Sequence, residues 1–429
     1  MFEYTLANGV IVSPGKEAYT GSLSVKGENI VSPVNSKTGN TQKISLKKKS
    51  FVYPSLINTH DHLQGNYRPP VGPKKGKFYL TWLPWDQDFK ASKTYEERSK
   101  LSREDLYALS GYKCLFSGVT TVNDHFPHNL NSQIIPTLPI RAIQEYCIAH
   151  ECSTYDLKWG DGIEAEHKKA VENNWPFITH LSEGFDDEAM NGVEMLEKLN
   201  ILDKHCLLVH CIAFSDEDIQ KVAKAGASVS WCGFSNMFMF NVTAKIKKMI
   251  DAGVNITIGT DSSATGSANL LAELKYDREL YRKLYGEDLP AEKIFEMVTI
   301  NSAKAFLMEN RVGSLDEGKL ADILVMKAKH DDPYENLVNA GMKDIELLIL
   351  AGKPIYGEMR FLDIFQEKPG KSGLPQGYTQ IKVGSKIMFV KGDPASLYKE
   401  VREKIGFKKK LDYLPFEPAI ESDKTEDRI

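Results

Sequence analysis

The amino-acid sequence predicts an α/β protein: a TIM-like (β/α)8 barrel with a small β-sandwich domain that both ends of the chain build. Three observations support this prediction. Strand-like and helix-like segments alternate through the middle of the chain, β-rich segments stand at both ends, and polar residues follow the apolar strands of the middle part. Because such a barrel takes about 250 residues, the rest of the 429 residues must form another unit.

The two ends of the chain are rich in β-forming residues, which Gly, Pro and Asn interrupt. Strands are expected near the start at 4–7, 9–12, 22–25 and 51–60, and near the other end at 321–326 and 345–355. We therefore expect a β-sandwich domain built from residues 1–54 and 311–365, a barrel over 55–310, and a C-terminal extension over 366–429.

The middle of the chain alternates between strands and helices, which is typical of parallel βαβ units. The expected strands are 118–124, 140–148, 176–180, 206–210, 227–231 and 255–261. The expected helices are 162–174, 188–199, 216–225, 245–251 and 291–309. The span from His125 to His180 is short by about one unit at roughly 30 residues per unit, so we expect an incomplete barrel or one degenerate β/α unit.

Composition limits the classes of partner. Charged residues make up 26% of the chain and the formal net charge is −4, which argues against a surface that coats nucleic acid. No apolar run approaches the roughly 20 residues that cross a bilayer, and no signal peptide is visible. The six cysteines form no close pair, and we interpret them as free thiols. These features predict a cytoplasmic protein without a nucleic-acid or membrane partner.

Five groups that can bind a metal follow the predicted strands: His60, His62, His180, His210 and Asp261. Two histidines at positions i and i+2 of a strand lie on the same face and can reach one ion. A single histidine at a strand end is usually structural. In a parallel barrel, however, the carboxyl ends of the strands form one rim, so the joint pattern predicts a metal centre there.

Several motifs, in order along the chain, resemble those of the amidohydrolase superfamily. They are Asn-Thr-His-Asp-His at 58–62, Ser-Gly-Val-Thr-Thr-Val at 117–122, His-Leu-Ser-Glu at 180–183, His-Cys at 210–211 with Ser-Asp-Glu-Asp at 215–218, Ser-Asn at 235–236 and Gly-Thr-Asp at 259–261. Within the superfamily, they are similar to the group that contains triazine hydrolases, guanine deaminase and S-adenosylhomocysteine deaminase. The resemblance covers roughly residues 1–360.

The resemblance implies one divalent metal per chain, held by His60, His62, His180 and Asp261. Zinc suits this set of ligands, with iron, manganese or cobalt as alternatives. His210 would orient the attacking water or act as a base, and Asp261 would accept a proton from it. Glu183 would protonate a ring nitrogen and pass a proton to the leaving group.

The reaction that this resemblance implies is hydrolytic deamination of a nitrogen heterocycle by water that the metal activates. Alternatives are hydrolysis of a cyclic amide or a chlorinated ring, a binuclear site with a carboxylated Lys158, and an inactive scaffold on the same fold. By analogy with relatives, the chain is expected to be a homo-oligomer.

Expectations for substrate contacts are coarser. Gln64, Trp82 and Trp85 follow the first metal motif, where a loop would cover the metal and aromatic rings could stack on a planar substrate. Either His125 or His128 is expected to line the pocket, and Asn236 to hold a loop near the site. The remaining histidines are assigned to structure or solvent: His150, His167, His205 and His330.

Overall fold

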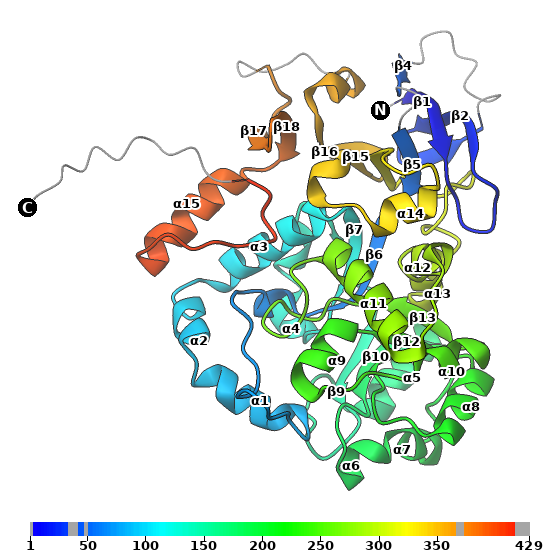
Figure 1. The fold of residues 1–429 in the computed structure, drawn as a ribbon, viewed down its shortest axis with the longest axis vertical. Coiled ribbons are helices and arrows are strands. Elements are labelled where there is room, and N and C mark those ends of the chain that lie inside the picture. The colour runs from blue at the N-terminus through cyan, green and yellow to red at the C-terminus, as the bar shows by residue number, and fades with distance from the viewer. Residues whose placement is uncertain (1–2, 33–41, 47–49, 366–372, 417–429) are drawn as a thin grey trace, which may run out of the picture.

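The computed structural model describes residues 3–32, 42–46, 50–365 and 373–416. The molecule is elongated, with a mixed sheet at one end and parallel strands covered by helices at the other (Figure 1). No helix in the described ranges combines the length and apolar character needed to cross a membrane.

The mixed sheet has ten strands, which both ends of the chain contribute. Their order is β17-β18-β16-β15-β14-β5-β1-β2-β3, with β4 beside β1. The bounds are β1 (Glu3–Ile11), β2 (Tyr19–Lys26), β3 (Asn29–Val31), β4 (Gln42–Ser45), β5 (Ser50–Pro54), β14 (Ile323–Lys327), β15 (Ile345–Leu350), β16 (Lys353–Glu358), β17 (Tyr378–Val383) and β18 (Lys386–Lys391). The two strands expected at 4–7 and 9–12 are one strand, because a bulge at Asn8 (φ 66°) lets β1 stay paired with β2.

The remaining strands form two parallel sheets. One has the order β6-β7-β8, with β6 (Leu56–Asp61), β7 (Val119–Asp124) and β8 (Arg141–Ala142). The other has the order β13-β12-β11-β10-β9, with β9 (Cys147–Glu151), β10 (Phe177–Leu181), β11 (Cys206–His210), β12 (Ser228–Trp231) and β13 (Asn255–Ile258). The predicted α/β class with parallel strands is therefore confirmed.

The two parallel sheets approach each other at β6 and β13, and a short connection joins β8 to β9. The main-chain N–H of Asp261 donates to the oxygen of His60 (3.1 Å), so the end of β13 lies beside β6. At the other edge, only residues 143–146 separate β8 from β9, and no helix lies between them. The strand expected at 140–148 is thus two short strands, of which β8 pairs with β7 and β9 with β10. The short unit that the sequence predicts lies at this point.

Fifteen α-helices in the described ranges connect and cover the strands. They are α1 (Trp82–Lys90), α2 (Lys93–Arg98), α3 (Arg103–Phe116), α4 (His128–Asn131), α5 (Ile163–Asn173), α6 (Asp187–Met190), α7 (Gly192–Lys198), α8 (Asp216–Ala225), α9 (Gly233–Phe240), α10 (Ile246–Asp251), α11 (Leu270–Tyr285), α12 (Ala291–Met297), α13 (Ile300–Ala305), α14 (Pro333–Val338) and α15 (Pro394–Ile405). Short 3-10 helices are η1 (Leu63–Gly65), η2 (Ile135–Thr137), η3 (Met342–Asp344) and η4 (Met359–Ile364). The helix expected at 291–309 is split into α12 and α13 at Thr299, whose ψ of −98° is not helical.

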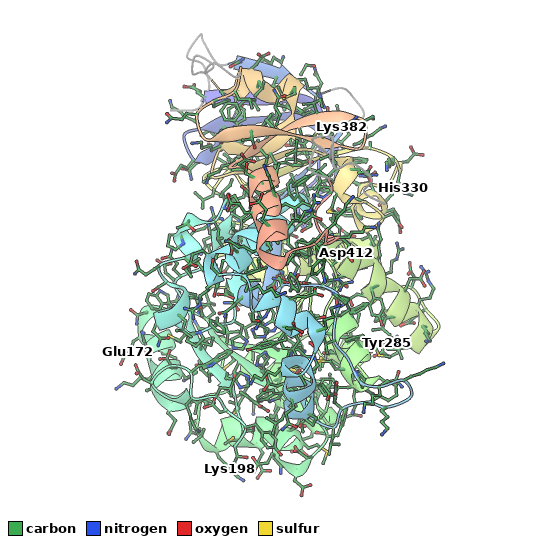
Figure 2. All side chains as sticks on the ribbon, turned by 90° about the vertical axis from the view of Figure 1, so that its left-hand side faces the viewer. Glu172, Lys198, Tyr285, His330, Lys382 and Asp412 are labelled. Atoms are coloured by element: carbon green, nitrogen blue, oxygen red, sulfur yellow. The ribbon has the colours of Figure 1, made fainter. Side chains whose placement is uncertain are left out.

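The described part of the predicted C-terminal extension is attached to both halves of the molecule. Strands β17 and β18 complete the mixed sheet, and α15 lies against α3 (Figures 1 and 2). The Lys404 ammonium pairs with the Asp105 carboxylate (2.6 Å), and Asp412 pairs with Arg68 (3.1 Å). Residues 366–372 and 417–429 of the extension lie outside the described residues.

A pair of buried carboxyl groups supports α9 from the side of α11. Glu273 and Asp277 are one helical turn apart and are both 0% exposed, and Glu273 Oε1 accepts the N–H of Phe234 in the first turn of α9 (2.9 Å). Burial raises the pKa of Glu273 to about 7. Burial, and then the charge of Glu273, raise the pKa of Asp277 well above its ordinary value. At neutral pH, the pair therefore retains protons that an unfolded chain would lose.

This pair predicts a pH-dependent stability. The folded protein binds the protons more tightly than the unfolded chain, so stability is full below the ordinary Glu pKa and is lost as the pH rises toward about 7. Glu273→Gln keeps an oxygen for the Phe234 N–H and removes one titrating group. Calorimetry gives the free energy of unfolding at pH 5 and at pH 8. The fall in this free energy between the two pH values should be smaller in the variant by on the order of 1–3 kcal/mol. Glu279→Gln, an exposed position on the same helix, is the matched control. Equal pH profiles for wild type and Glu273→Gln would contradict this interpretation.

Candidate metal centre

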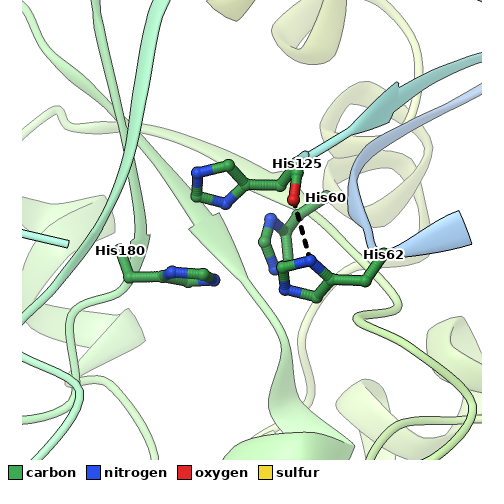
Figure 3. Close-up of side chains that lie close together, drawn as sticks. All are labelled: His60, His62, His125 and His180. Carbon is green, nitrogen blue, oxygen red and sulfur yellow. Dashed lines mark hydrogen bonds between the residues drawn. The ribbon is translucent and has the colours of Figure 1, made fainter. Parts of the chain in front are cut away.

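Four imidazole rings converge where the parallel strands end. His60 and His62 come from the end of β6, His125 follows β7, and His180 lies in β10 (Figure 3). One ring nitrogen of each lies within 4.8 Å of the others. Imidazole nitrogens at such separations are a typical ligand set for a divalent transition metal. Parallel strand order thus brings together residues that are far apart in the sequence.

Main-chain carbonyl groups fix the orientation of three of these rings. His62 Nδ1 contacts the oxygen of His125 (2.9 Å), His180 Nδ1 contacts that of His150 (2.6 Å), and His125 Nε2 contacts that of Ala149 (3.0 Å). A carbonyl oxygen only accepts, so these nitrogens carry the hydrogens. The other nitrogen of each ring therefore keeps its lone pair, as a metal ligand must.

His60 lies at the centre of the cluster and is the most unusual of the four. Its side chain is fully buried, and neither ring nitrogen has a hydrogen-bond partner among the described residues. Burial, and then the neighbouring His62, lower the pKa of His60 well below its ordinary value, so the ring is neutral. Because an unpartnered buried polar group costs about 1–3 kcal/mol, the site fits a cation that would take up this lone pair.

Asp261 supplies a carboxylate beside the rings. Its Oδ1 lies 3.8 Å from His60 Nε2 and 3.7 Å from His62 Nε2. Its Oδ2 accepts hydrogen bonds from the hydroxyl groups of Ser235 (2.7 Å) and Thr265 (2.9 Å). Burial alone would raise the pKa of Asp261, but nearby histidines and these donors lower it overall, so the group is ionised.

The Gly-Thr-Asp motif has a steric reason. A Cβ atom at Gly259 would lie 2.7 Å from the Cβ of His60, so only glycine lets β13 approach β6 this closely. Asp261 itself adopts a positive φ of 53°, as does His210 at 71°. Non-glycine residues rarely adopt this conformation, and it is common at functional sites.

His210 and Glu183 form a second polar group that shares His180 with the cluster. His210 Nδ1 donates to the amide oxygen of Asn236 (2.8 Å), which leaves the lone pair on Nε2, 3.5 Å from Glu183 Oε1. Burial raises the pKa of Glu183 well above its ordinary value, and the charges of Asp261 and Glu151 add to this. Glu183 is therefore a buried carboxylic acid that can donate a proton.

A buried ion pair lies behind the metal-binding side chains. Lys113 of α3 is 1% exposed and donates to Asp61 Oδ2 (2.8 Å), Asn66 Oδ1 (2.8 Å) and the main-chain oxygen of Asp261 (3.4 Å). Asp61 stands between the two histidines of the first motif and also accepts from Thr260 (3.2 Å). The ammonium group thus connects β6 to the end of β13, the two segments that carry three of the predicted ligands.

The predicted substrate contacts have different surroundings. Trp82 is buried, its Nε1 donates to Glu151 (2.6 Å), and its ring lies 4.8 Å from that of His150. Trp85 instead stacks on Phe89 within α1 (5.2 Å).

Gln64 and Asn236 lie close to the metal-binding side chains. Gln64 lies in η1, two residues after His62. Its buried Oε1 has no hydrogen-bond partner among the described residues. Asn236 holds the His210 ring in place.

Sequence reasoning missed three rings beside the centre. His125, expected only to line a pocket, belongs to the four-histidine group, and its Nδ1 is unpartnered within the described part of the chain. His150, assigned to structure or solvent, lies 5.2 Å from His180 and 4.6 Å from Trp159. Trp159 also faces His125 at 5.7 Å. His125 follows a predicted strand, so the strand-end rule identifies it, whereas no local pattern identifies Trp159.

Two other expectations have a clear structural outcome. The Lys158 side chain is 82% exposed and its ammonium lies 3.6 Å from Asp156, so it does not join the cluster. The idea of a carboxylated lysine between two metals is therefore wrong, because the backbone at Lys158 (φ 59°) turns this side chain outward. His330 is exposed (Figure 2). All six cysteines are free and buried.

The buried ion pair of Lys113 and Asp61 predicts how stability changes on mutation. Lys113→Met removes the ammonium and leaves the Asp61 carboxylate buried and unpaired, which should cost about 3–5 kcal/mol of unfolding free energy. The double variant Lys113→Met/Asp61→Asn removes both charges and should recover most of that loss. Denaturant unfolding of the three proteins measures both values, and a double variant as unstable as Lys113→Met alone would refute the pairing.

Part of the chain matches a known protein family, and most of the chain is similar to several known proteins. Residues 169–355 match the model of the amidohydrolase family. A 5-methylthioadenosine/S-adenosylhomocysteine deaminase of Pyrococcus abyssi is 24% identical to this chain, over 80% of it and 91% of the relative.

Solved structures agree on the fold. An adenosine deaminase from Xanthomonas campestris with bound zinc aligns with a TM-score of 0.70 at 16% identity, over 94% of this chain and 98% of that chain. An atrazine chlorohydrolase from Arthrobacter aurescens complexed with zinc aligns with a TM-score of 0.67 at 19% identity, over 82% and 95%. The resemblance drawn from the motifs is thereby confirmed: part of the chain matches the amidohydrolase family, and the chain is similar to deaminases and to a triazine-type chlorohydrolase.

Proposed function

We propose that this protein is a metal-dependent hydrolase that deaminates a nitrogen heterocycle. The observation that carries the proposal is the arrangement of a buried, unpartnered imidazole, His60, among other neutral imidazoles, with the protonated Glu183 and the ionised Asp261 nearby. Acid, base and metal-binding groups at one point are what hydrolysis of a carbon–nitrogen bond needs. The deaminase relative supports the same chemistry.

The residues present fit one divalent metal. His60, His62, His180 and Asp261 would hold it, and the unpartnered Nδ1 of His125 stands beside them as a further ligand candidate. Zinc suits nitrogen and oxygen ligands and is bound in two similar structures, while iron, manganese and cobalt suit the same set. When bound, the metal would lower the pKa of water and so supply hydroxide at neutral pH.

Side chains of the protein donate and accept the protons of the reaction. Glu183, whose raised pKa favours the protonated form, is the proton donor to a ring nitrogen of the substrate. The carboxylate that results takes up a proton released by the attacking water and passes it to the departing amine. His210 presents an unprotonated Nε2, because Asn236 binds the opposite nitrogen. It is therefore suited to accept a hydrogen bond from the attacking water and to orient it.

Aromatic rings beside the cluster support a planar substrate. Trp159 and His150 lie edge to face 4.6 Å apart, and Trp82 faces His150. Such surfaces can stack on a purine, pyrimidine or pterin. The alternative is hydrolysis of a cyclic amide or a chlorinated ring, which the likeness to an atrazine chlorohydrolase supports.

The finer features of the fold belong to the same proposal. We infer a closed parallel barrel over 55–310 in which residues 141–151 form one interrupted strand in place of a full β/α unit. The mixed sheet is proposed to be a β-sandwich domain built from 1–54 and 311–365, to which β17 and β18 of the 366–429 extension add two strands. A small-molecule substrate, a cytoplasmic location, a homo-oligomeric state and the absence of nucleic-acid or membrane partners remain predictions.

The direct test is a product assay. Metal-loaded protein is incubated with adenosine derivatives, free purines, pyrimidines, pterins and chlorinated triazines, and ammonia and chloride release are measured in parallel. The proposal expects ammonia from at least one heterocyclic amine and activity that chelation removes. Chloride release without ammonia would favour the alternative, and no turnover on any of these compounds with a full metal site would count against an enzyme of this class.

Glu183→Gln tests the proton donor. The amide cannot pass a proton to the substrate, so kcat should fall by a factor of about 10² or more, while metal content and Tm stay near those of the wild type. Metal analysis and steady-state kinetics on the identified substrate provide the measurement. Glu188→Gln, an exposed site a few residues further on, serves as the control. A Glu183→Gln enzyme with the full rate would remove this residue from the mechanism.

A further inference from the structure

A second group of potential metal ligands lies at the opposite end of the parallel strands. Strand β11 ends at His210, in the candidate active site, and begins at Cys206, roughly 13 Å away along the strand. Near that start, His167 of α5, Asp203 and Cys206 each place a ligand atom within 4.8 Å of the other two. The two groups share no residue.

The immediate surroundings of this second group are those of a prepared site. His167 is 7% exposed and Cys206 is 1% exposed, whereas the Asp203 side chain is 38% exposed and faces solvent. His167 Nε2 lies 3.3 Å from Asp203 Oδ1, but the ring does not direct an N–H at the oxygen, so this buried nitrogen has no hydrogen-bond partner in the described ranges. This buried ring nitrogen therefore lies close to a carboxylate and a thiol and forms no hydrogen bond with either.

A neighbouring histidine holds the carboxylate in place. Asp203 Oδ1 accepts the main-chain N–H of His205 (2.8 Å) and lies 3.2 Å from His205 Nδ1. His205 in turn is fixed, because its main-chain oxygen accepts the N–H of Phe177 at the start of β10 (2.8 Å). A group that orients a ligand in this way is a regular feature of metal sites.

The donor atoms specify the kind of ion. One thiol sulfur, one imidazole nitrogen and one carboxylate oxygen are the ligands that zinc takes, whereas calcium and magnesium prefer oxygen alone. Ligand atoms around a tetrahedral zinc lie roughly 3.5 Å apart, given bonds of about 2.0–2.3 Å, so small rotations about the side-chain bonds close the group. Burial raises the pKa of Cys206 to about 12, and its Sγ–H donates to the oxygen of Ile201 (3.0 Å). Metal binding would release this proton.

We propose that His167, Asp203 and Cys206 form a second metal site for zinc or a similar divalent ion, with the fourth position open to solvent. The ion ties α5 to the segment that leads into β11. α5 follows β9, the strand that the short connection 143–146 joins to β8, so the ion would support the sheet beside that connection. The site stabilises the fold and takes no part in the reaction.

Cobalt spectroscopy separates this site from the candidate active site. The active-site group has only nitrogen and oxygen ligands and gives no cobalt–thiolate charge-transfer band. Such a band in the near ultraviolet must come from a cysteine, which in the proposed second site is Cys206. Chelated wild-type protein is titrated with Co²⁺ to saturation. The proposal expects this band together with two metal ions per chain. Absence of the band in saturated wild-type protein overturns it.

Variants assign the band. Cys206→Ala and His167→Gln should each bind one metal fewer, and Cys206→Ala should lose the band completely. Cys114→Ala, which removes another buried thiol, should keep the band and both metals. His60→Ala should lose the first metal and retain the band, so failure of the proposed function and failure of this inference give different results. A band that persists in Cys206→Ala would refute the assignment, and melting curves confirm that each variant is folded.

Discussion

The buried imidazole of His60 needs a partner for its ring nitrogens, and the rest of the site is arranged around this need. The rings around His60 are oriented by main-chain carbonyls, so each presents a lone pair, and His60 itself has no bond to any described group. A protein core does not tolerate several unpartnered ring nitrogens unless a ligand takes them up. The neutral state of these rings, which burial enforces, is the state in which imidazole binds a metal.

The surroundings of two neighbouring carboxyl groups, Asp261 and Glu183, shift their pKa values in opposite directions. Asp261 receives hydrogen bonds from two hydroxyls and remains ionised, whereas burial and the charges of Asp261 and Glu151 raise the pKa of Glu183 and favour its protonated form. One fold thus supplies a base and an acid side by side. The helix α9 serves both, because it carries Ser235, which binds Asp261, and Asn236, which binds His210. Its first turn is held in turn by Glu273.

The short connection between β8 and β9 changes what surrounds the metal-binding groups. With no helix between β8 and β9, residues 143–151 run directly past the end of β7, and their carbonyls bind the rings of His125 and His180. The same stretch brings His150 to the cluster, and Trp159, which follows it in the chain, lies beside His125. We infer that the second metal group, at the other end of β11, reinforces the neighbouring unit, so the two sites serve the same group of strands in different ways.

The sequence by itself determined the class of fold and the core of the site. Alternating strands and helices imply parallel pairing, and parallel pairing gathers strand ends, so His60, His62, His180, His210 and Asp261 could be predicted to meet. Tertiary structure alone decided the rest. The pairing of Lys113 with Asp61 joins positions 52 residues apart and depends on how α3 packs, and Lys158 points outward because of its backbone conformation. Trp159 and His150 reach the site through irregular chain that has no periodic pattern. The spacing of apolar residues shows which face of a helix or strand is buried. Contacts between elements depend on tertiary packing, which no local sequence pattern indicates.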